Sequence, residues 1–367
     1  MNRSVLHSLR KLIFGIFGIF GFLVIGFSLT SCGGETVTKE DETTEAETPE
    51  KSSVTVYTHR HYDVDKEIFK DFTEKTGVEV EVLFADASQI LERLEQEGEK
   101  SPADLVFTVD AKGLVQVKQK DLLQSIESEK LNENIPAKFR DADGYWYGLT
   151  YRGRIVVYDK DRVDPTRLST YQNLTAPEWE DRILVRSSSN VYNRGLLSSM
   201  ITLYGKEAAQ NWAKGLVINM ARAPKGNDRA QVRGIAEGVG DLAIINTYYM
   251  GLLKFSEDST ERASVENIGV FFPNQDSEGA HINLSMAGVA KHAPNKAGAV
   301  ALLEYLSTKE VQEKYANANF EYPVNQASEP HELLKSWGDF KTQTITVEEI
   351  AEKTNDAVAI FQQANWK

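Results

Sequence analysis

Several kinds of catalytic or metal-binding site can be excluded for this 367-residue chain, because the residues they need are missing from it. Its single cysteine excludes an internal disulfide framework and any zinc or iron–sulfur site built from cysteines. There is no G-x-S-x-G elbow, H-E-x-x-H pair or phosphate-binding glycine loop, which argues against an enzyme. Six histidines and 14 tyrosines remain. Because an isolated tyrosine is more often a packing residue than a ligand, only its position can single it out.

The elements that must position such residues begin with strands and helices in alternation. Residues 54–58, 78–84 and 104–107 have the apolar or alternating pattern of strands. Asp63 is the expected N-cap of a helix that ends at Gly77. Strands that alternate with helices of about ten residues are typical of βαβ units, so we expect an α/β fold with a parallel sheet.

A second alternation follows residues 143–158, where we expect two short strand-like runs with glycines between them. Its strands and helices are expected at 183–185, about 192–203, 206–216, about 229–237, 242–245, 281–290 and about 296–306. This pattern predicts two α/β lobes, with the chain crossing between them near residue 150 and again near residue 280. A ligand would bind in the cleft between the lobes, where strands end and helices begin.

The N-terminus has the pattern of an export signal. Residues 12–29 are apolar or glycine except for Ser28, and three basic residues precede them. The run is just long enough to cross a bilayer, so an uncleaved anchor is the alternative. Residues 29–32, Leu-Thr-Ser-Cys, have the form of a bacterial lipobox. We therefore expect residues 1–31 to be a lipoprotein signal peptide, and lipid, palmitate included, to be attached to Cys32.

Charge is unevenly distributed along a chain whose net charge is −13. Residues 33–53 contain seven acidic residues, two lysines and no aromatic residue. Such a segment cannot bury enough apolar surface to fold, so residues 32–53 are expected to be a lipidated cysteine and a solvated tether. The body is also acidic, which argues against binding to nucleic acid. Both readings of the N-terminus place the body in the periplasm or cell envelope, and the inner or outer membrane is left open.

An exported chain with two α/β lobes resembles the bacterial periplasmic solute-binding proteins that serve ABC importers. Three segments narrow the resemblance: His61-Tyr62 after the first strand, Asn190-Val-Tyr192 after 183–185, and Gly-Asp-Leu-Ala-Ile-Ile-Asn-Thr-Tyr-Tyr at 240–249. Over roughly residues 54–367 the chain is similar to the ferric-iron-binding branch, and within it to the cyanobacterial type with one histidine and four tyrosines.

The resemblance implies a monomer with a type II periplasmic-binding-protein fold and two crossover strands between the lobes. Lobe 1 would comprise residues 54–150 and about 282–330, and lobe 2 about 151–281 and about 331–367. The chain would deliver iron to an ABC permease and its ATPase, and would have no catalytic activity. The alternatives are a binding protein for an organic solute or anion, such as a polyamine or a carboxylate, and a tethered sensor or iron chaperone that never meets a permease.

Carried over residue by residue, the resemblance implies a set of iron ligands. Fe³⁺ is the expected transported ion, with Fe²⁺ left open, and it is a hard cation that prefers charged oxygen donors. A phenol has a pKa of about 10 in water, and a nearby trivalent ion lowers it, so binding releases protons and weakens in acid. Neutral imidazole adds a donor without charge. The implied ligands are His61, Tyr62, Tyr192, Tyr248 and Tyr249.

For other side chains near these segments, the sequence leaves two possible roles open. His59 ranks second to His61, because the His61-Tyr62 adjacency matches the family. An anion completes the iron shell in several sub-branches, although five protein ligands would make one unnecessary. Arginines could hold such an anion or a phenolate, or form salt bridges within the acidic body; they are Arg152, Arg154 and Arg194. An aromatic cluster at the crossover is either hinge packing or a wall for an organic ligand: Tyr145, Trp146, Tyr147 and Tyr151.

Overall fold

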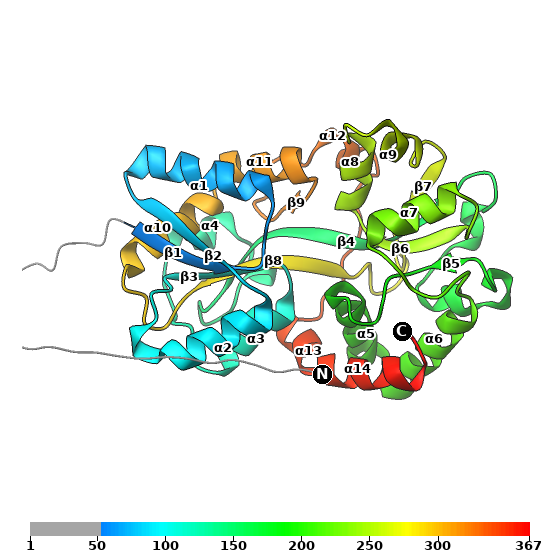
Figure 1. Ribbon diagram of the computed structural model, residues 1–367, viewed down its shortest axis with the longest axis horizontal. Helices are drawn as coiled ribbons and strands as arrows, with labels where there is room; N and C mark the ends of the chain where they lie inside the picture. The colour runs from blue at the N-terminus through cyan, green and yellow to red at the C-terminus, as the bar shows by residue number, and fades with distance from the viewer. Residues whose placement is uncertain (1–52) are drawn as a thin grey trace, which may run out of the picture. The chain divides into compact units, whose positions relative to one another are not determined.

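The computed structural model describes residues 53–367, which form a mixed α/β body (Figure 1). The predicted signal peptide, Cys32 and all of the predicted tether except its last residue lie outside the described residues. That residue, Ser53, begins the first strand. Among the helices of residues 53–367, none is long and apolar enough to cross a membrane.

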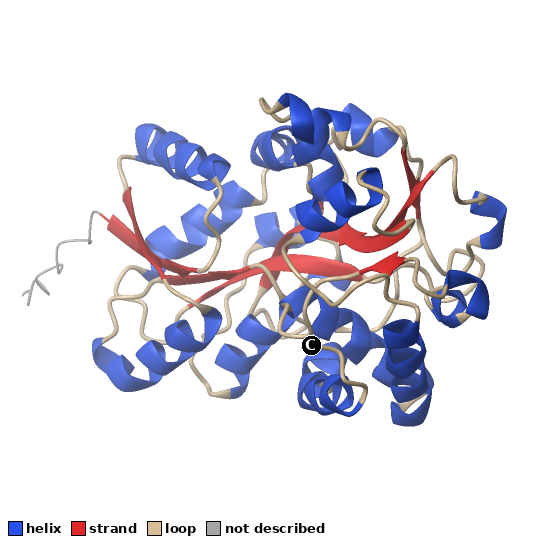
Figure 2. Ribbon diagram, turned by 45° about the vertical axis from the view of Figure 1, so that its right-hand side comes forward, coloured by secondary structure: helices blue, strands red, loops and turns tan. Residues whose placement is uncertain are grey.

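One nine-stranded sheet runs through the body, with helices on both sides of it (Figure 2). The strand order is β2-β1-β3-β8-β4-β6-β5, and β7 and β9 also pair with β4. The strands are β1 (Ser53–Thr58), β2 (Glu79–Phe84), β3 (Leu105–Thr108), β4 (Tyr147–Asp159), β5 (Ile183–Leu184), β6 (Leu242–Asn246), β7 (Ile268–Phe271), β8 (Ile282–Val289) and β9 (Tyr322–Pro323).

The sheet is parallel only towards its two ends. β1 pairs in parallel with β2 and β3, and β5 pairs in parallel with β6. In the middle, β8 is antiparallel to β3 and β4, and β4 is antiparallel to β6. The expectation of a parallel sheet therefore holds for the βαβ units, and it is wrong for the strands by which the chain crosses from one unit to the other.

The two strand-like runs expected at 143–158 are one strand, β4, of 13 residues. Its first half pairs with β8, and from Arg154 onward it pairs with β6. The ladder shifts register between Gly148 and Thr150. A shift of this kind bends a strand without ending it, which is why the glycine does not break β4 as expected. A Cβ at Gly148 would lie 2.8 Å from the Phe139 carbonyl oxygen, so the close approach needs glycine there.

Helices cover the sheet around two separate hydrophobic regions. Their bounds are α1 (Asp63–Thr76), α2 (Ala87–Glu97), α3 (Ala111–Gln119), α4 (Glu129–Asn134), α5 (Val191–Tyr204), α6 (Lys206–Ile218), α7 (Asp228–Ala236), α8 (Tyr248–Lys254), α9 (Ser259–Ala263), α10 (Lys296–Leu306), α11 (Lys309–Asn319), α12 (Glu332–Lys335), α13 (Val347–Glu352) and α14 (Thr354–Gln363). Short 3-10 turns lie at Gly98–Lys100, Ala137–Phe139, Pro165–Arg167, Gln172–Thr175 and Pro177–Trp179.

The first core surrounds β1, β3 and the facing part of β8, with α1, α2 and α10 packed on it. We call this part the first lobe. The second lobe surrounds the distal half of β4 together with β6, and its core has two parts. Residues of α5, α6 and α14 form one part, and residues of α7 and α8 form the other. Of the strands, β4 contributes buried residues to both lobes, so it ties them together.

Two helix starts fix side chains at the junction of the lobes. Tyr62, not Asp63 as expected, is the N-cap residue of α1, and the helix ends at Gly77, whose φ of 75° is left-handed. The Asn190 side chain caps α5 by accepting hydrogen bonds from the backbone N–H groups of Tyr192 and Asn193 at 3.2 and 3.4 Å. Both predicted iron ligands on these helices, Tyr62 and Tyr192, therefore lie at a helix N-terminus.

Candidate metal centre

A cavity of about 660 Å³ is lined by all five of the predicted ligands. His61 and Tyr62 follow β1, and Tyr192 is the second residue of α5. Tyr248 and Tyr249 open α8 directly after β6. The structure thus brings together residues that are up to 188 positions apart in the chain, because each follows a strand whose end faces the same region.

The rings are in mutual contact across the two lobes. The ring centroids of His61 and Tyr62 are 5.3 Å apart, and those of Tyr248 and Tyr249 are 4.1 Å apart. Tyr62, which packs on the first core, meets Tyr248 of the second lobe edge to face at 6.3 Å. The two pairs of aromatic residues, one from each lobe, therefore meet at the cavity.

Three of the four phenols are held neutral by their surroundings. Tyr192 is 6% exposed and Tyr248 is 3% exposed, and burial raises the pKa of both phenols well above its ordinary value. Neighbouring phenols raise these pKa values further, and the positive charge of Arg152 opposes them only in part. Burial and the nearby carboxylate of Asp228 also raise the pKa of Tyr249. These three phenols are therefore neutral without a cation, and they become anionic when a cation replaces their protons.

The donor set differs from that of a carboxylate or thiolate metal site. Within residues 53–367, no three His, Cys, Asp or Glu side chains gather as such a site would require. The cavity is lined by four phenols, by the imidazoles of His59 and His61, and by the carboxylates of Asp63 and Glu67. Phenolate oxygens suit a hard, highly charged cation. The chemistry of the donors therefore fits Fe³⁺ better than a soft metal.

The position of His61 distinguishes it from His59. The Nε2 atom of His59 accepts a hydrogen bond from the backbone N–H of Val109 at 3.1 Å and lies 3.4 Å from an Asp110 carboxylate oxygen. The exposed ring of His61 has one polar contact, from Nδ1 to the His59 carbonyl oxygen at 3.5 Å. No hydrogen bond engages Nε2 of His61 among the described residues. This geometry favours His61 as the ligand, as the sequence ranking did.

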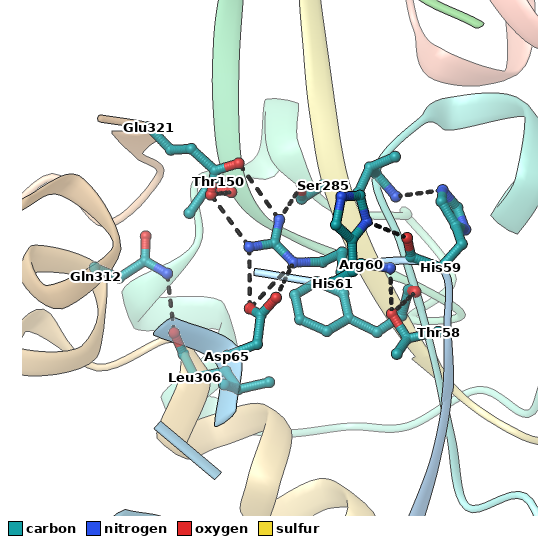
Figure 3. Close-up of polar contacts among 12 residues, drawn as sticks. Thr58, His59, Arg60, His61, Asp65, Thr150, Ser285, Leu306, Gln312 and Glu321 are labelled. Carbon is teal, nitrogen blue, oxygen red and sulfur yellow. Dashed lines mark hydrogen bonds and ion pairs between the residues drawn. The ribbon is translucent and has the colours of Figure 1, made fainter. Parts of the chain in front are cut away.

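A buried ion-pair network holds the His61-Tyr62 segment in place (Figure 3). Arg60 pairs with Asp65 at 3.0 Å and with Glu321 at 3.3 Å, and it donates a hydrogen bond to the Ser285 hydroxyl at 2.7 Å. Its guanidinium also lies 4.9 Å from the centre of the Tyr62 ring. Arg60 therefore joins the start of α1 to β8, and fixes the two predicted ligands that follow it.

Two of the three candidate arginines are fully buried in ion pairs and do not line the cavity. The Nε atom of Arg152 lies 2.8 Å from Glu321, and its guanidinium is 5.7 Å from the centre of the Tyr248 ring. Arg154 pairs with Asp228 at 3.3 Å and donates to the Asn193 side chain at 2.6 Å. The structure thus favours the salt-bridge alternative for both, with Arg152 also packed behind a phenol.

The third arginine, Arg194, lies apart from the phenols. It lines a different cavity, and its Nε atom donates to the Ser188 carbonyl oxygen at 3.2 Å. The predicted role of Arg194 beside the iron finds no support in this arrangement.

Sequence reasoning missed Arg186, which lines the phenol cavity. Its Nη1 atom lies 3.5 Å from the Tyr249 hydroxyl and 3.8 Å from an Asp228 carboxylate oxygen, and its guanidinium is 6.0 Å from the centre of the Tyr192 ring. A positive charge there favours the phenolate form of its neighbours. Arg186 lies two residues after β5, so the positional signal that selected the tyrosines would also have found it.

The aromatic cluster at the crossover consists mainly of packing residues. The Tyr147 hydroxyl donates to the Ile126 carbonyl oxygen at 3.0 Å, and the Trp146 ring nitrogen donates to Glu348 at 2.9 Å. Tyr151 stacks between Phe139 and Tyr322, at 5.3 and 5.2 Å. None of the four lines the phenol cavity. The hinge-packing interpretation fits Tyr145, Trp146 and Tyr147, whereas Tyr151 also lines a second cavity.

The seating of α8 depends on a glycine that faces Phe320. A Cβ at Gly251 would lie 2.1 Å from the Phe320 ring. We expect Gly251→Ala to destabilise the protein by about 1–3 kcal/mol through overpacking, and to weaken metal binding because α8 carries Tyr248 and Tyr249. Thermal unfolding and metal titration measure the two effects. The matched control is Gly113→Ala, where the nearest neighbour would be 3.4 Å away. Equal stability of the two variants would contradict the packing argument.

Fold and cavity together define a two-lobed binding protein, and comparison with known proteins shows the family to which it belongs. The chain belongs to the bacterial extracellular solute-binding proteins, whose family model matches residues 100–342. It is 40% identical to iron uptake protein A1 of Synechocystis sp. over 98% of both chains. A solved Trichodesmium structure (IdiA, FutA) in complex with iron and citrate is 40% identical, with a TM-score of 0.82 over 86% of this chain and 100% of that one.

A ferric binding protein from Campylobacter jejuni is similar to the same degree. It is 37% identical, with a TM-score of 0.81 over 86% of this chain and 100% of that one. These relatives confirm the predicted resemblance to the ferric-iron-binding branch and the predicted type II fold with two lobes.

Proposed function

We propose that this protein captures ferric iron in the cavity between its lobes and delivers it to an ABC permease outside the cytoplasmic membrane. The observation that carries the proposal is the convergence of His61, Tyr62, Tyr192, Tyr248 and Tyr249 on one cavity. Relatives named for iron uptake and ferric binding, at up to 40% identity over nearly the whole chain, support it.

The five side chains would act as the ligands of one ion. Three phenolates neutralise the charge of Fe³⁺, the fourth leaves the site with one negative charge, and His61 adds a neutral donor. Arg186 and the buried Arg152 offset this excess negative charge from outside the ligand set. Because the first lobe supplies His61 and Tyr62 and the second supplies the other three, bound iron stabilises the arrangement in which the lobes are closed. A permease can then distinguish loaded from empty protein by shape.

The remaining parts of the proposal follow the sequence. Residues 1–31 direct export, lipid on Cys32 anchors the chain, and residues 33–53 tether the body to the membrane. Lobe 1 comprises 54–150 and about 282–330, lobe 2 comprises the rest of the body, and the protein works as a monomer without catalytic activity. The two cores support this division, since β4 links them.

The test is a titration of the purified, iron-free chain with Fe³⁺, followed by visible absorption and metal analysis. Phenolate bound to ferric iron absorbs visible light, so we expect an orange to red protein with one iron per chain. Citrate in parallel titrations shows whether an anion completes the shell. A colourless chain that binds no Fe³⁺ but binds a polyamine or a carboxylate would favour the organic-solute alternative instead.

Iron binding should depend steeply on pH. The phenols of Tyr192, Tyr248 and Tyr249 have raised pKa values, so they are protonated in the empty protein at neutral pH. Each must lose its proton to bind Fe³⁺, so we expect these three phenols to release about three protons per iron, with affinity falling as pH falls. Titration in weakly buffered solution counts the protons. Tyr192→Phe should release one fewer, and pH-independent binding would contradict a phenolate site.

A further inference from the structure

A second cavity, of about 500 Å³, lies next to the phenol-lined one and shares only Val191 with it. Its walls come from β8, from the first turns of α5 and from the C-terminal segment 340–354. Phe139 and Tyr151 close the side nearest the first lobe. The volume is within the range of pockets that hold small molecules, and the proposed iron site makes no use of it.

Positively charged side chains outnumber carboxylates around this cavity, although the protein as a whole is acidic. Four cationic side chains line it: Lys112, Lys138, Arg194 and Lys341. Asp110 is the one carboxylate in the wall, and it is already engaged, accepting from the Gly113 backbone N–H at 3.0 Å and lying 3.4 Å from His59. Among the described residues, none of the four cations forms an ion pair with a carboxylate. The cavity is therefore electrostatically suited to an anion.

The rest of the lining is apolar. Ile282 and Leu284 of β8, Phe340 and Val347 supply hydrocarbon surface beside the cations. A purely inorganic anion would leave this surface in contact with water, and a purely apolar molecule would leave the cations without a partner. A ligand with an anionic group on an apolar body would both pair with the cations and cover the apolar lining.

A buried histidine at the wall is also incompletely satisfied. His281 is 2% exposed, and its Nδ1 atom lies 3.2 Å from the Gln343 side-chain oxygen. Its Nε2 atom has no hydrogen-bond partner in the structure. This atom faces Gly195, where a Cβ would come within 3.2 Å of it. A buried polar atom without a partner beside a cavity is expected where a ligand or water completes the contact.

We propose that this cavity binds a small organic anion with an apolar body, namely a carboxylate attached to an aromatic ring or a short alkyl chain. The carboxylate lies among the cations of α3, α5 and the segment before β4, and the apolar body lies against β8 and α13. The site is separate from the proposed iron site, and its occupation does not depend on iron.

The test uses 2-naphthoate as a fluorescent probe on the full, iron-free chain, with 2-naphthylmethanol as the neutral analogue. We expect one naphthoate per chain, bound at least about tenfold more tightly than the alcohol, as charge-assisted hydrogen bonds predict. Lys112→Gln combined with Arg194→Gln should weaken naphthoate binding by at least about tenfold. Lys214→Gln, an exposed lysine of α6 that lines neither cavity, is the matched control and should change nothing.

Two further measurements keep the proposal separate from iron binding. Val347→Phe fills the apolar side without changing charge and should also weaken naphthoate binding, while Tyr192→Phe should leave it unchanged. Equal binding of acid and alcohol, or naphthoate binding that neither lining variant weakens, would overturn the proposal. Displacement of naphthoate by one equivalent of Fe³⁺ would also overturn it, because the probe would then occupy the phenol cavity.

Discussion

Replacing Tyr192 or Tyr248 by phenylalanine is expected to weaken ferric-iron binding by more than about 100-fold. Loss of a group that only supports a ligand typically costs about 10–100-fold in metal affinity, and each of these changes removes a ligand atom itself. Phenylalanine keeps the ring, so the packing of Tyr248 against Tyr62 and Tyr249 is preserved. Competition with a chelator of known affinity measures the loss, and a shifted visible band reports the missing phenolate.

The control for these variants is Tyr305→Phe. Tyr305 is a half-buried tyrosine, its hydroxyl has no hydrogen-bond partner in the structure, and it lines neither cavity. Its loss should leave both the affinity and the spectrum unchanged. Normal iron binding by Tyr192→Phe would remove that residue from the site, and normal binding by both Tyr192→Phe and Tyr248→Phe would refute the ligand set.

Glu321→Gln should reduce the free energy of unfolding by about 3–5 kcal/mol, the usual cost of leaving a buried ion without its partner. Glu321 is 0% exposed and pairs with both Arg60 and Arg152, and it also accepts a hydrogen bond from Thr150 at 2.9 Å. Glutamine keeps the shape and removes the charge. Within the described part of the chain, Asp65 would then be the one carboxylate paired with Arg60, and Arg152 would lose its carboxylate partner.

Urea unfolding measures this loss, with Glu310→Gln as the control. Glu310 pairs with Lys75 at 3.0 Å on an exposed surface, where such a pair contributes about 0–1 kcal/mol. Equal losses in the two variants would contradict a structural role for the buried network. Because Arg60 precedes His61, we also expect Glu321→Gln to weaken iron binding, although Glu321 does not line the cavity.

The same network gives the stability of the protein a defined response to acid. Burial would raise the pKa of Glu321, but Arg152 and Arg60 outweigh burial and hold it below its ordinary value. A carboxylate with a depressed pKa stabilises the fold above its unfolded pKa, and that stability is lost as pH falls through the folded value. Glu321→Gln should therefore flatten the loss of stability below about pH 4, the range in which a free glutamate titrates.

The sequence was most informative where short apolar runs ended in unusual side chains. Residues 54–58 and 242–245 were recognisable as buried strands, and His61-Tyr62 and Tyr248-Tyr249 follow them at the edge where strand ends meet. Position after a strand is a local property, so it could be predicted. The particular ligand set came from the family resemblance, and it remains a prediction that the cavity geometry supports.

The features that could not be predicted depend on contacts between distant residues. Glu321 pairs with Arg60, which is 261 positions away in the sequence, and no local pattern in either segment predicts the pairing. The sequence predicted two strands in the place of β4, because glycines interrupt the local pattern. The hydrogen bonds to β8 and then to β6 keep β4 a single strand. The short helix α13, which packs against both α3 and α5, has too few turns for a clear apolar period.

The most direct test is a crystal structure of the iron-loaded chain, with anomalous scattering recorded at the iron absorption edge. We expect one iron peak in the cavity, within bonding distance of the His61 ring and of the hydroxyl oxygens of residues 62, 192, 248 and 249. A peak bound elsewhere, or an occupied cavity in which the tyrosines do not contact the metal, would contradict the account.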